Sequence, residues 1–404
     1  MQILELLLHY SLWGMGSFLL LNCLYLLFFT VAGHFPRTID APPDITKPAG
    51  YLRHIGVLIP AYKADAVILD TAKAALRHRY EGAFQVVVIA DGLRASTIQA
   101  LRQAGAEVVP VSFERSTKGK ALLQALRTLP AAAFDVAVVL DADNIMGKGC
   151  LQDINRAFSA GYRVVQTHRT ALNEDTGFAL LDACNEEINN HIYRQGPFAL
   201  GLSSALIGSG MAFEHDYLEH LLINIGETVG EDKELDFRIA RDQVKVGYLA
   251  DTYVYDEKIE NAAMFTRQRS RWLASQLEFL MKYAREGVTQ LLRHGNVQFF
   301  NKSLQTFLVP RTLLIGVLGL FLLLSLVLPV GPPVAFWVGL LLLLAGTLLL
   351  ALPGRFYNWQ LLQVVVWLPY AIACMCLALL RMHRTKSSFL ATPHKARMPS
   401  STPD

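Results

Sequence analysis

The sequence predicts an α/β domain with a mostly parallel sheet, joined to an α-helical transmembrane region. Short apolar runs alternate with helical patterns between His34 and Trp272. Three flanking segments contain no charged residue: Ser11 to Gly33, Thr312 to Gly354 and Phe356 to Leu380. The whole chain is 52% hydrophobic with a mean hydropathy of +0.31, which is too apolar for one ordinary soluble domain.

The N-terminal segment is long enough to cross a bilayer, whose core needs roughly 20 apolar residues as helix. Its uncharged run from Ser11 to Gly33 is longer than the apolar region of a signal peptide, and no small-residue cleavage site follows it. We therefore expect a retained transmembrane helix within residues 1–33.

The segment 34–272 is expected to form the α/β domain. Four short β-branched or apolar runs are the predicted strands: Ile55 to Ile59, Phe84 to Ala90, Glu107 to Val111 and Phe134 to Leu140. The predicted helices between and after them are Ala66 to Arg79, Ser96 to Gln103, Lys120 to Leu129 and Cys150 to Ala160. Strands that alternate with helices imply a mostly parallel sheet, and such sheets bind ligands at the carboxyl ends of their strands.

Carboxylates stand at two of these strand ends. Asp91 follows the second run, and Asp141-Ala142-Asp143 follows the fourth. Alternate residues of an extended segment face the same side, so the pair at Asp141 and Asp143 can hold a hard divalent cation together with substrate phosphates. The alternative is a simple strand-to-turn exit, where aspartate is favoured for local hydrogen bonds.

Two glycine-containing loops are candidate ligand contacts. Lys118-Gly119-Lys120 opens a helical pattern, where it could meet a phosphate or a uracil carbonyl, although its spacing is not that of a P-loop. Gly208-Ser209-Gly210 could let the backbone approach a ligand closely. A solvated loop and a plain turn are the respective alternatives.

An acidic pair precedes another helical pattern. Glu231 and Asp232 come just before Leu235 and Ile239, which places Asp232 near a helix N-terminus, where an ionised carboxylate is stabilised. An ionised aspartate with a free face can act as general base on an acceptor hydroxyl. The alternative is the ordinary preference of acidic residues for helix N-termini.

The pentad Gln268-Arg269-Ser270-Arg271-Trp272 combines guanidinium groups, an amide and an indole in little more than one helical turn. Arginine suits phosphate oxygens, and a tryptophan face suits a sugar ring. Arg and Trp are also common at bilayer edges, so an interfacial anchor is the alternative.

The segment 273–310 is predicted to form amphipathic interface helices. Apolar residues recur there on one helical stripe, and Lys282, Arg285 and Arg293 lie off it. The alternative is a helix packed on the soluble domain. Its apolar stripe comprises Leu273, Leu277, Leu280, Met281, Ala284, Val288, Leu291 and Leu292.

Residues 311–381 are expected to form transmembrane or interface helices. A Pro-Val-Gly-Pro-Pro break at residues 329–333 divides the first uncharged stretch in two. The last stretch, Phe356 to Leu380, contains Gln360, Gln363 and Pro369, and a basic tail over residues 382–404 follows it. Basic segments favour the cytoplasmic side, so we expect this last stretch to lie in the interface or re-enter instead of spanning.

The motifs, taken in their order, resemble those of the membrane-embedded family 2 glycosyltransferases, the cellulose synthase and hyaluronan synthase group. The resemblance covers about Ile55 to Trp272. It implies a GT-A fold, a UDP-sugar donor, Mg²⁺ or Mn²⁺, and an inverting reaction without a covalent enzyme intermediate. The tail segment Phe389 to Lys395 also resembles the cytoplasmic gating loop of these synthases.

The resemblance also implies roles for individual residues. Asp91 would contact the uridine, Asp141 and Asp143 would hold the diphosphate and the metal, and Asp232 would be the catalytic base. Gln268 and Arg271 would bind the pyrophosphate, and Trp272 would support the acceptor sugar. The remaining predicted substrate contacts are Lys118, Gly210 and Glu231.

The predicted function is metal-dependent transfer of a hexosyl group at the membrane, with the catalytic domain cytoplasmic and the chain integral to a bacterial inner membrane. Our first prediction is processive synthesis and translocation of a polysaccharide, with a growing glycan as acceptor and possible secretion partner proteins. The alternatives are addition of one sugar to a lipid acceptor, and a non-catalytic sugar-nucleotide sensor or export channel. Membrane lipids are expected partners, and nucleic acids are not.

Overall fold

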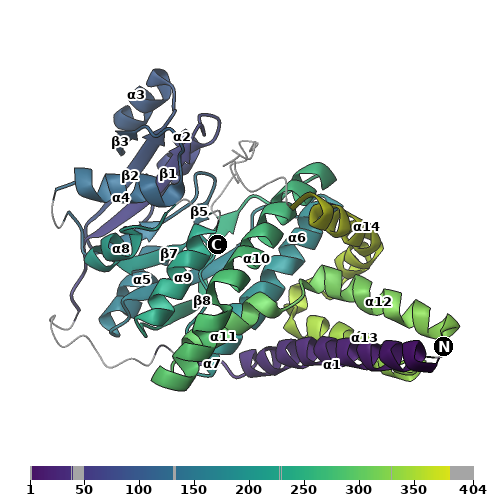
Figure 1. Ribbon diagram of the computed structural model, residues 1–404. Coiled ribbons are helices and arrows are strands. Elements are labelled where there is room, and N and C mark those ends of the chain that lie inside the picture. The colour runs from purple at the N-terminus through teal and green to yellow at the C-terminus, as the bar shows by residue number, and fades with distance from the viewer. Residues whose placement is uncertain are drawn as a thin grey trace.

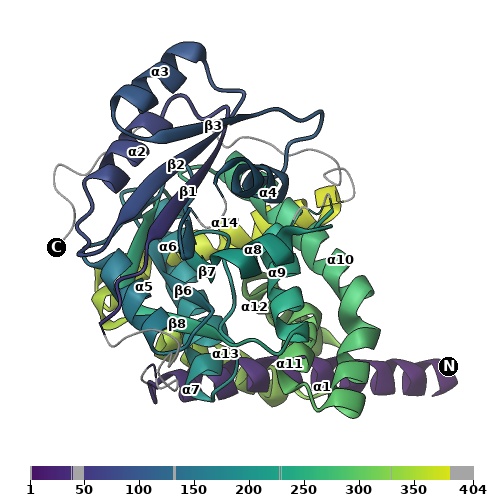
Figure 2. The same ribbon diagram turned by 90° about the vertical axis from the view of Figure 1, so that its left-hand side faces the viewer.

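The computed structural model describes residues 2–382 except 38, 40–49, 131–132, 227, 229 and 329. It contains an α/β domain and a group of long helices that extend away from one side of it (Figures 1 and 2). The expected gating-loop segment, Phe389 to Lys395, lies outside the described residues.

The α/β domain is built on one eight-stranded sheet, with strand order β3-β2-β1-β4-β7-β6-β8-β5. Strands β1 to β4 run parallel, β7 runs antiparallel between β4 and β6, and β8 is parallel to β6. The sheet is therefore mixed but mostly parallel, as predicted. Its strands are β1 (Ile55–Tyr62), β2 (Phe84–Asp91), β3 (Glu107–Val111), β4 (Val136–Val139), β5 (Ile145–Met146), β6 (Val164–Ala171), β7 (Met211–Glu214) and β8 (Val246–Asp256).

Helices cover both faces of the sheet because successive strand residues point to opposite sides. In β1, Ile55, Val57 and Ile59 enter the core beneath α2 (Ile68–Leu76), α3 (Ala95–Gln103) and α5 (Cys150–Ser159). Leu58 faces the other core, beneath α4 (Lys118–Thr128), α8 (His215–Leu222) and α9 (Glu231–Arg241). Both faces of the central strands are buried, which explains why they read as continuous apolar runs.

A second group of helices joins the domain to the apolar region. Helix α6 (Gly177–Asn189) continues through a π-helical segment (Asn190–Gln195) into α7 (Gly196–Ala199), and this run contacts α1 (Gln2–Gly33). The approach at Gly196 is close enough that an added Cβ would overlap the carbonyl oxygen of Phe29. A larger residue at this position would separate α7 from α1.

Helix α10 (Ala262–His294) is continuous across the predicted boundary between residues 272 and 273. The predicted apolar stripe of this helix is buried in its first part and exposed in its second. Leu273 is buried, and Leu277 is partly buried, whereas Met281, Val288 and Leu292 are exposed. The helix also buries an aromatic face against α9 and α11 (Val297–Phe307); that cluster consists of Phe237, Phe279, Tyr283 and Phe299.

The long apolar helices fall into two groups (Figure 1). Helix α1 packs with α12 (Arg311–Val327) and α13 (Val334–Ala351) around a core that includes Cys23, Leu318 and Trp337. Helix α14 (Trp359–Arg381) follows a short 3-10 turn (Gly354–Phe356) and packs on α6, α10 and α12.

Among the residues that the structure describes, three helical segments are long and apolar enough to cross a membrane: Ile3–Gly33, Val334–Ala351 and Trp359–Arg381. Helices α11 and α12, which meet at 51°, add a fourth if they count as one span. Helix α14 thus meets the requirement for a span although it packs on α6 and α10 and contains Pro369. Its interfacial placement remains a prediction.

Candidate active site

One cavity of about 890 Å³ lies where the carboxyl ends of β1, β2 and β4 face α6, α9, α10 and the start of α12. Eight of the ten predicted site residues line it: Asp91, Lys118, Asp141, Asp143, Asp232, Gln268, Arg271 and Trp272. The fold therefore brings together motifs that are separated by up to about half the chain. The other two residues, Gly210 and Glu231, are not among its lining residues.

The sheet end of the cavity carries three carboxylates. Asp91 is the last residue of β2, and Asp141 and Asp143 follow β4. Asp141 is held in place because its backbone N–H donates to Ser209 Oγ at 2.9 Å. The Lys118 ammonium group forms an ion pair with Asp141 and donates to the carbonyl oxygen of Gly208 at 2.6 Å. Lys118 therefore connects α4 to the loop after β4 and to the loop before β7.

The pair Asp141 and Asp143 fits a hard divalent cation, because both are carboxylate ligands and both line the same cavity. Within the described part of the chain, no group of three or more His, Cys, Asp or Glu side chains could hold a metal ion. A cation at this pair would therefore take its remaining ligands from donor phosphates and water, as Mg²⁺ commonly does.

Gly210 and Glu231 support the site from outside the cavity. Gly210 has φ of +63°, and a Cβ there would overlap the Thr167 hydroxyl oxygen, so it serves close packing of β7 against β6. Glu231 Oε2 accepts a hydrogen bond of 2.8 Å from the Gly119 N–H, which ties the first turn of α4 to the first turn of α9. Burial raises the pKa of Glu231.

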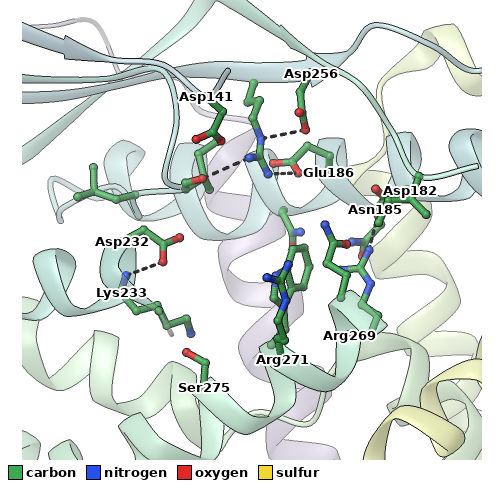
Figure 3. Close-up of a pocket in the computed structure, with 18 of the residues that line it drawn as sticks. Asp141, Asp182, Asn185, Glu186, Asp232, Lys233, Asp256, Arg269, Arg271 and Ser275 are labelled. Carbon is green, nitrogen blue, oxygen red and sulfur yellow. Dashed lines mark hydrogen bonds and ion pairs between the residues drawn. The ribbon is translucent and has the colours of Figure 1, made fainter. Parts of the chain in front are cut away.

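Asp232 enters the cavity from the first turn of α9 (Figure 3). Its Oδ1 accepts a hydrogen bond of 2.9 Å from the backbone N–H of Lys233. In the described residues, no Lys, Arg or His forms an ion pair with Asp232. The carboxylate is thus oriented by the backbone, and it interacts electrostatically with the neighbouring Lys233 without a direct ion pair.

The residues of the pentad Gln268 to Trp272 differ in position: some line the cavity, and Arg269 contacts other protein groups. Gln268, Arg271 and Trp272 line the cavity, and Trp272 is 43% exposed. Arg269 is buried in an ion pair with Asp182 of α6, and its guanidinium carbon lies 4.0 Å from the centroid of the Trp272 ring. Arg269 therefore orients the indole by a cation–π contact.

A buried ionic network beside the site was not predicted from the sequence. Arg169 of β6 lies 2.8 Å from Glu186 of α6 and 3.7 Å from Asp256 of β8, and Lys258 lies 2.9 Å from Asp256. Although burial opposes it, the charges of Arg169 and Lys258 hold the pKa of Glu186 far below its usual range. The sequence did carry a signal, since polar residues recur on one face of α6 at positions Asp182, Asn185, Glu186 and Asn189.

The opposite end of the cavity combines apolar side chains with polar and charged ones. It is lined by residues from the junction between α11 and α12 and by Met375 of α14. Leu308, Val309 and Pro310 form this part of the wall. The same cavity therefore runs from the carboxylates at the sheet to the helices that are candidates for the membrane.

Known proteins with similar sequences include two synthases of the same name. Beta-monoglucosyldiacylglycerol synthase from Nostoc sp. (strain PCC 7120) is 26% identical over 231 residues, which are 55% of this chain and 49% of the relative. The synthase of the same name from Synechocystis sp. (strain PCC 6803) is 24% identical over 312 residues, 75% of this chain and 65% of the relative. The matched regions thus span between about half and two thirds of these relatives.

Among solved structures, mannosyltransferase PcManGT from Pyrobaculum calidifontis, in complex with GDP-Man and Mn²⁺, aligns with a TM-score of 0.55. The alignment covers 93% of this chain and all of PcManGT at 16% identity, and the shared fold is GT-A. The family model described as glycosyltransferase like family 2 matches residues 53–275, which include every predicted site residue. Since this match covers more than half of the chain, the protein belongs to glycosyltransferase family 2.

Proposed function

We propose that this protein transfers one sugar from a nucleoside diphosphate sugar, with UDP-glucose as the first candidate, to the hydroxyl group of a diacylglycerol-type lipid. The observation that carries the proposal is one cavity with carboxylates at the sheet end and the apolar side chains of Leu308, Val309 and Met375 at the other end. The names of the glycolipid-synthase relatives support a lipid acceptor. They favour this alternative over our first prediction of processive polysaccharide synthesis.

The donor is proposed to bind at the sheet end. Asp91 and Lys118 would contact its nucleotide, and Gln268 and Arg271 would approach its diphosphate from α10. Burial lowers the pKa of Arg271, and the neighbouring Arg267 adds to this, but an arginine remains charged at neutral pH. A guanidinium in such a partly dehydrated position binds phosphate oxygens more strongly than it would in water.

Asp141 and Asp143 would hold Mg²⁺ or Mn²⁺, and the bound cation would neutralise charge on the leaving diphosphate. The PcManGT complex contains Mn²⁺, which supports this assignment. Lys118, already paired with Asp141, supplies a second positive charge near the same phosphates.

Asp232 is proposed as the general base. In one displacement, the acceptor oxygen forms a bond to the anomeric carbon while the bond from that carbon to the diphosphate oxygen breaks. The acceptor proton moves to Asp232, and the electron pair leaves with the diphosphate. The anomeric configuration is inverted, so an α-linked donor gives a β-linked glycolipid.

Retention of the lipid's acyl chains in the cavity would favour a single sugar addition. Acyl chains would occupy the apolar end at Leu308 and Val309, and Trp272 would cover the acceptor head beside Asp232. After transfer, the new sugar lies at the catalytic centre while the apolar anchor is still held by the helices. The product would have to shift by one sugar for a second addition, so release into the membrane is expected instead.

The test uses the full chain purified in detergent, with radiolabelled UDP-glucose and diacylglycerol in mixed micelles. We expect one labelled glycolipid carrying one β-linked sugar, and little product when EDTA is present. Asp232→Asn should reduce kcat by about 10²-fold or more, the usual contribution of a general base. The matched control is Asp251→Asn, which changes an exposed aspartate of β8 and should retain activity.

Parallel assays with UDP-galactose, UDP-N-acetylglucosamine, UDP-glucuronate and GDP-mannose would identify the donor. A ladder of water-soluble polysaccharide would defeat the lipid-acceptor proposal. Full activity of Asp232→Asn would instead defeat the base assignment alone.

A further inference from the structure

Arg311 is a buried cation without a carboxylate partner. It is the first residue of α12, and only 8% of it is exposed. Its Nη2 donates to the carbonyl and side-chain oxygens of Asn185 (3.1 and 2.6 Å) and to Asn189 Oδ1 (2.8 Å). Its Nη1 is buried and has no hydrogen-bond partner, and no described Asp or Glu forms an ion pair with Arg311. Such a charge is costly unless an anion meets it.

The surrounding network offsets this charge only in part. Glu186 attracts the Arg311 guanidinium, but it is already shared by Arg169, Arg194 and Lys258. Arg194 and Arg269 repel the guanidinium, and Asp182 is paired with Arg269. The charged groups of this network that line the cavity are five cations (Arg169, Arg194, Lys258, Arg269, Arg311) and three carboxylates (Asp182, Glu186, Asp256). The excess of positive charge predicts an anionic ligand.

The start of α12 adds to the positive potential. The helix has 17 residues, and its N-cap is Pro310, which provides no side-chain hydrogen bond to the first turn. Backbone N–H groups at such an end carry a partial positive charge and suit a phosphate group. Pro310, Arg311 and Thr312 all line the cavity, so this helix end is open to a ligand there.

The anion site lies away from the proposed base and metal carboxylates. Figure 3 shows Asn185, the partner of Arg311, across the cavity from Asp232 and Lys233. Arg311 and Thr312 line the cavity, and beyond them α12 continues into exposed apolar residues such as Leu323 and Val327. An anion that arrives with acyl chains can therefore place its charge at Arg311 and its chains along α12.

We propose that Arg311 and the N-terminus of α12 bind the phosphate group of a membrane phospholipid. The guanidinium Nη1 and the first-turn N–H groups donate to the phosphate oxygens, and the acyl chains lie against α12. The bound phosphate offsets the buried positive charge and fixes α12 against α6. This ligand differs from the uncharged acceptor, and its binding does not depend on the proposed transfer reaction.

The test measures binding of short-chain phosphatidylglycerol to the full chain in uncharged detergent, by native mass spectrometry and by the rise in Tm. Arg311→Gln should weaken binding about tenfold or more, because it removes a charge-assisted bond to phosphate. The matched control, Arg285→Gln, removes an exposed positive charge of α10 and should leave the affinity unchanged. Equal affinity of Arg311→Gln and the unmodified chain would overturn the proposal, as would an equal loss in both variants.

A second variant keeps the arginine. Asn189→Asp places a carboxylate at the position that already accepts from Arg311, so it should occupy the guanidinium and also weaken phosphatidylglycerol binding about tenfold. Unchanged binding by this variant would contradict the site even if Arg311→Gln failed to fold.

Competition binding experiments identify which molecule supplies the bound phosphate. Diacylglycerol, inorganic phosphate and UDP should each fail to displace phosphatidylglycerol at equal concentration. Displacement by UDP would assign the site to the donor, displacement by inorganic phosphate would assign it to a free anion, and displacement by diacylglycerol would assign it to the acceptor. Each of these results would overturn the phospholipid proposal while leaving the transferase assay intact.

Discussion

Replacing Lys302 with methionine should destabilise the protein strongly, because it breaks a buried ion pair between the catalytic domain and the apolar helices. Lys302 of α11 lies 2.8 Å from Asp236 of α9, and its side chain is only 4% exposed. It also donates to the carbonyl oxygen of Ser204 at 3.0 Å. After the change, Asp236 would keep one long hydrogen bond, 3.4 Å from the N–H of Leu206.

The magnitude follows from the cost of an uncompensated buried charge. Removing one partner of such a pair costs about 3–5 kcal/mol. At roughly 2–4 °C per kcal/mol for a domain of about 200 residues, Tm should fall on the order of 10 °C. Lys282→Met is the matched control, because Lys282 is 48% exposed and its partner Glu234 keeps Tyr283 and Arg238. Its cost should stay near or below 1 kcal/mol.

The assay is thermal unfolding of both variants in detergent at pH 5 and pH 8. Burial raises the pKa of Asp236 even with Lys302 in place, and losing that cation raises it further. A raised pKa in the folded state gives stability that is present at low pH and lost as pH rises through that pKa. The Lys302→Met deficit should therefore be larger at pH 8 than at pH 5.

A double variant supplies the decisive comparison. Lys302→Met with Asp236→Asn removes both charges, so it should be more stable at pH 8 than Lys302→Met alone. The reasoning fails if Lys302→Met loses no more Tm than Lys282→Met, or if the double variant shows no recovery.

Three further changes test other parts of the structure. Gly210→Ala should cost about 2–5 kcal/mol in chemical denaturation, because φ is +63° and the new methyl group would overlap a buried threonine. Gly177→Ala should weaken the docking of α14 by displacing Trp367, seen as faster proteolysis near α14, whereas Gly346→Ala, with open space around its Cα, should not. Asp141→Asn should raise the Mn²⁺ concentration for half-maximal activity about tenfold or more, and an unchanged Mn²⁺ dependence would remove Asp141 from the metal site.

The strands of the parallel half of the sheet could be predicted because burial on both faces leaves a continuous apolar run. The run from Phe84 extends through Asp91 as β2, and Glu107–Val111 was predicted to the residue. Strand β6 in the other half was not predicted because polar residues interrupt its apolar pattern. β6 includes Gln166, His168 and Arg169, which are polar residues that serve the buried network and interrupt the apolar pattern.

The candidate site also contains some residues whose position could be predicted from the sequence and others whose position could not. Side chains that project from strand ends and helix starts, such as Asp141 and Asp232, could be predicted because local geometry sets their direction. Glu231 and Gly210 sit in equally recognisable motifs, yet they contact protein groups, which only the tertiary structure decides. The role of Arg311 could not be predicted from the sequence, because a lone arginine before an apolar helix usually marks a membrane edge. Its burial depends on contacts with α6.

The length and continuity of helix α10 have a mechanical consequence. It carries the pentad in its first half and the exposed Met281, Val288 and Leu292 in its second, without a break. At 1.5 Å per residue, Trp272 and Arg293 are about 30 Å apart on one rod, so a tilt of about 10° about the outer end moves the indole by about 5 Å. Any contact that the exposed Met281, Val288 and Leu292 make outside the protein would thus be coupled through one rigid helix to the position of Trp272 at the cavity.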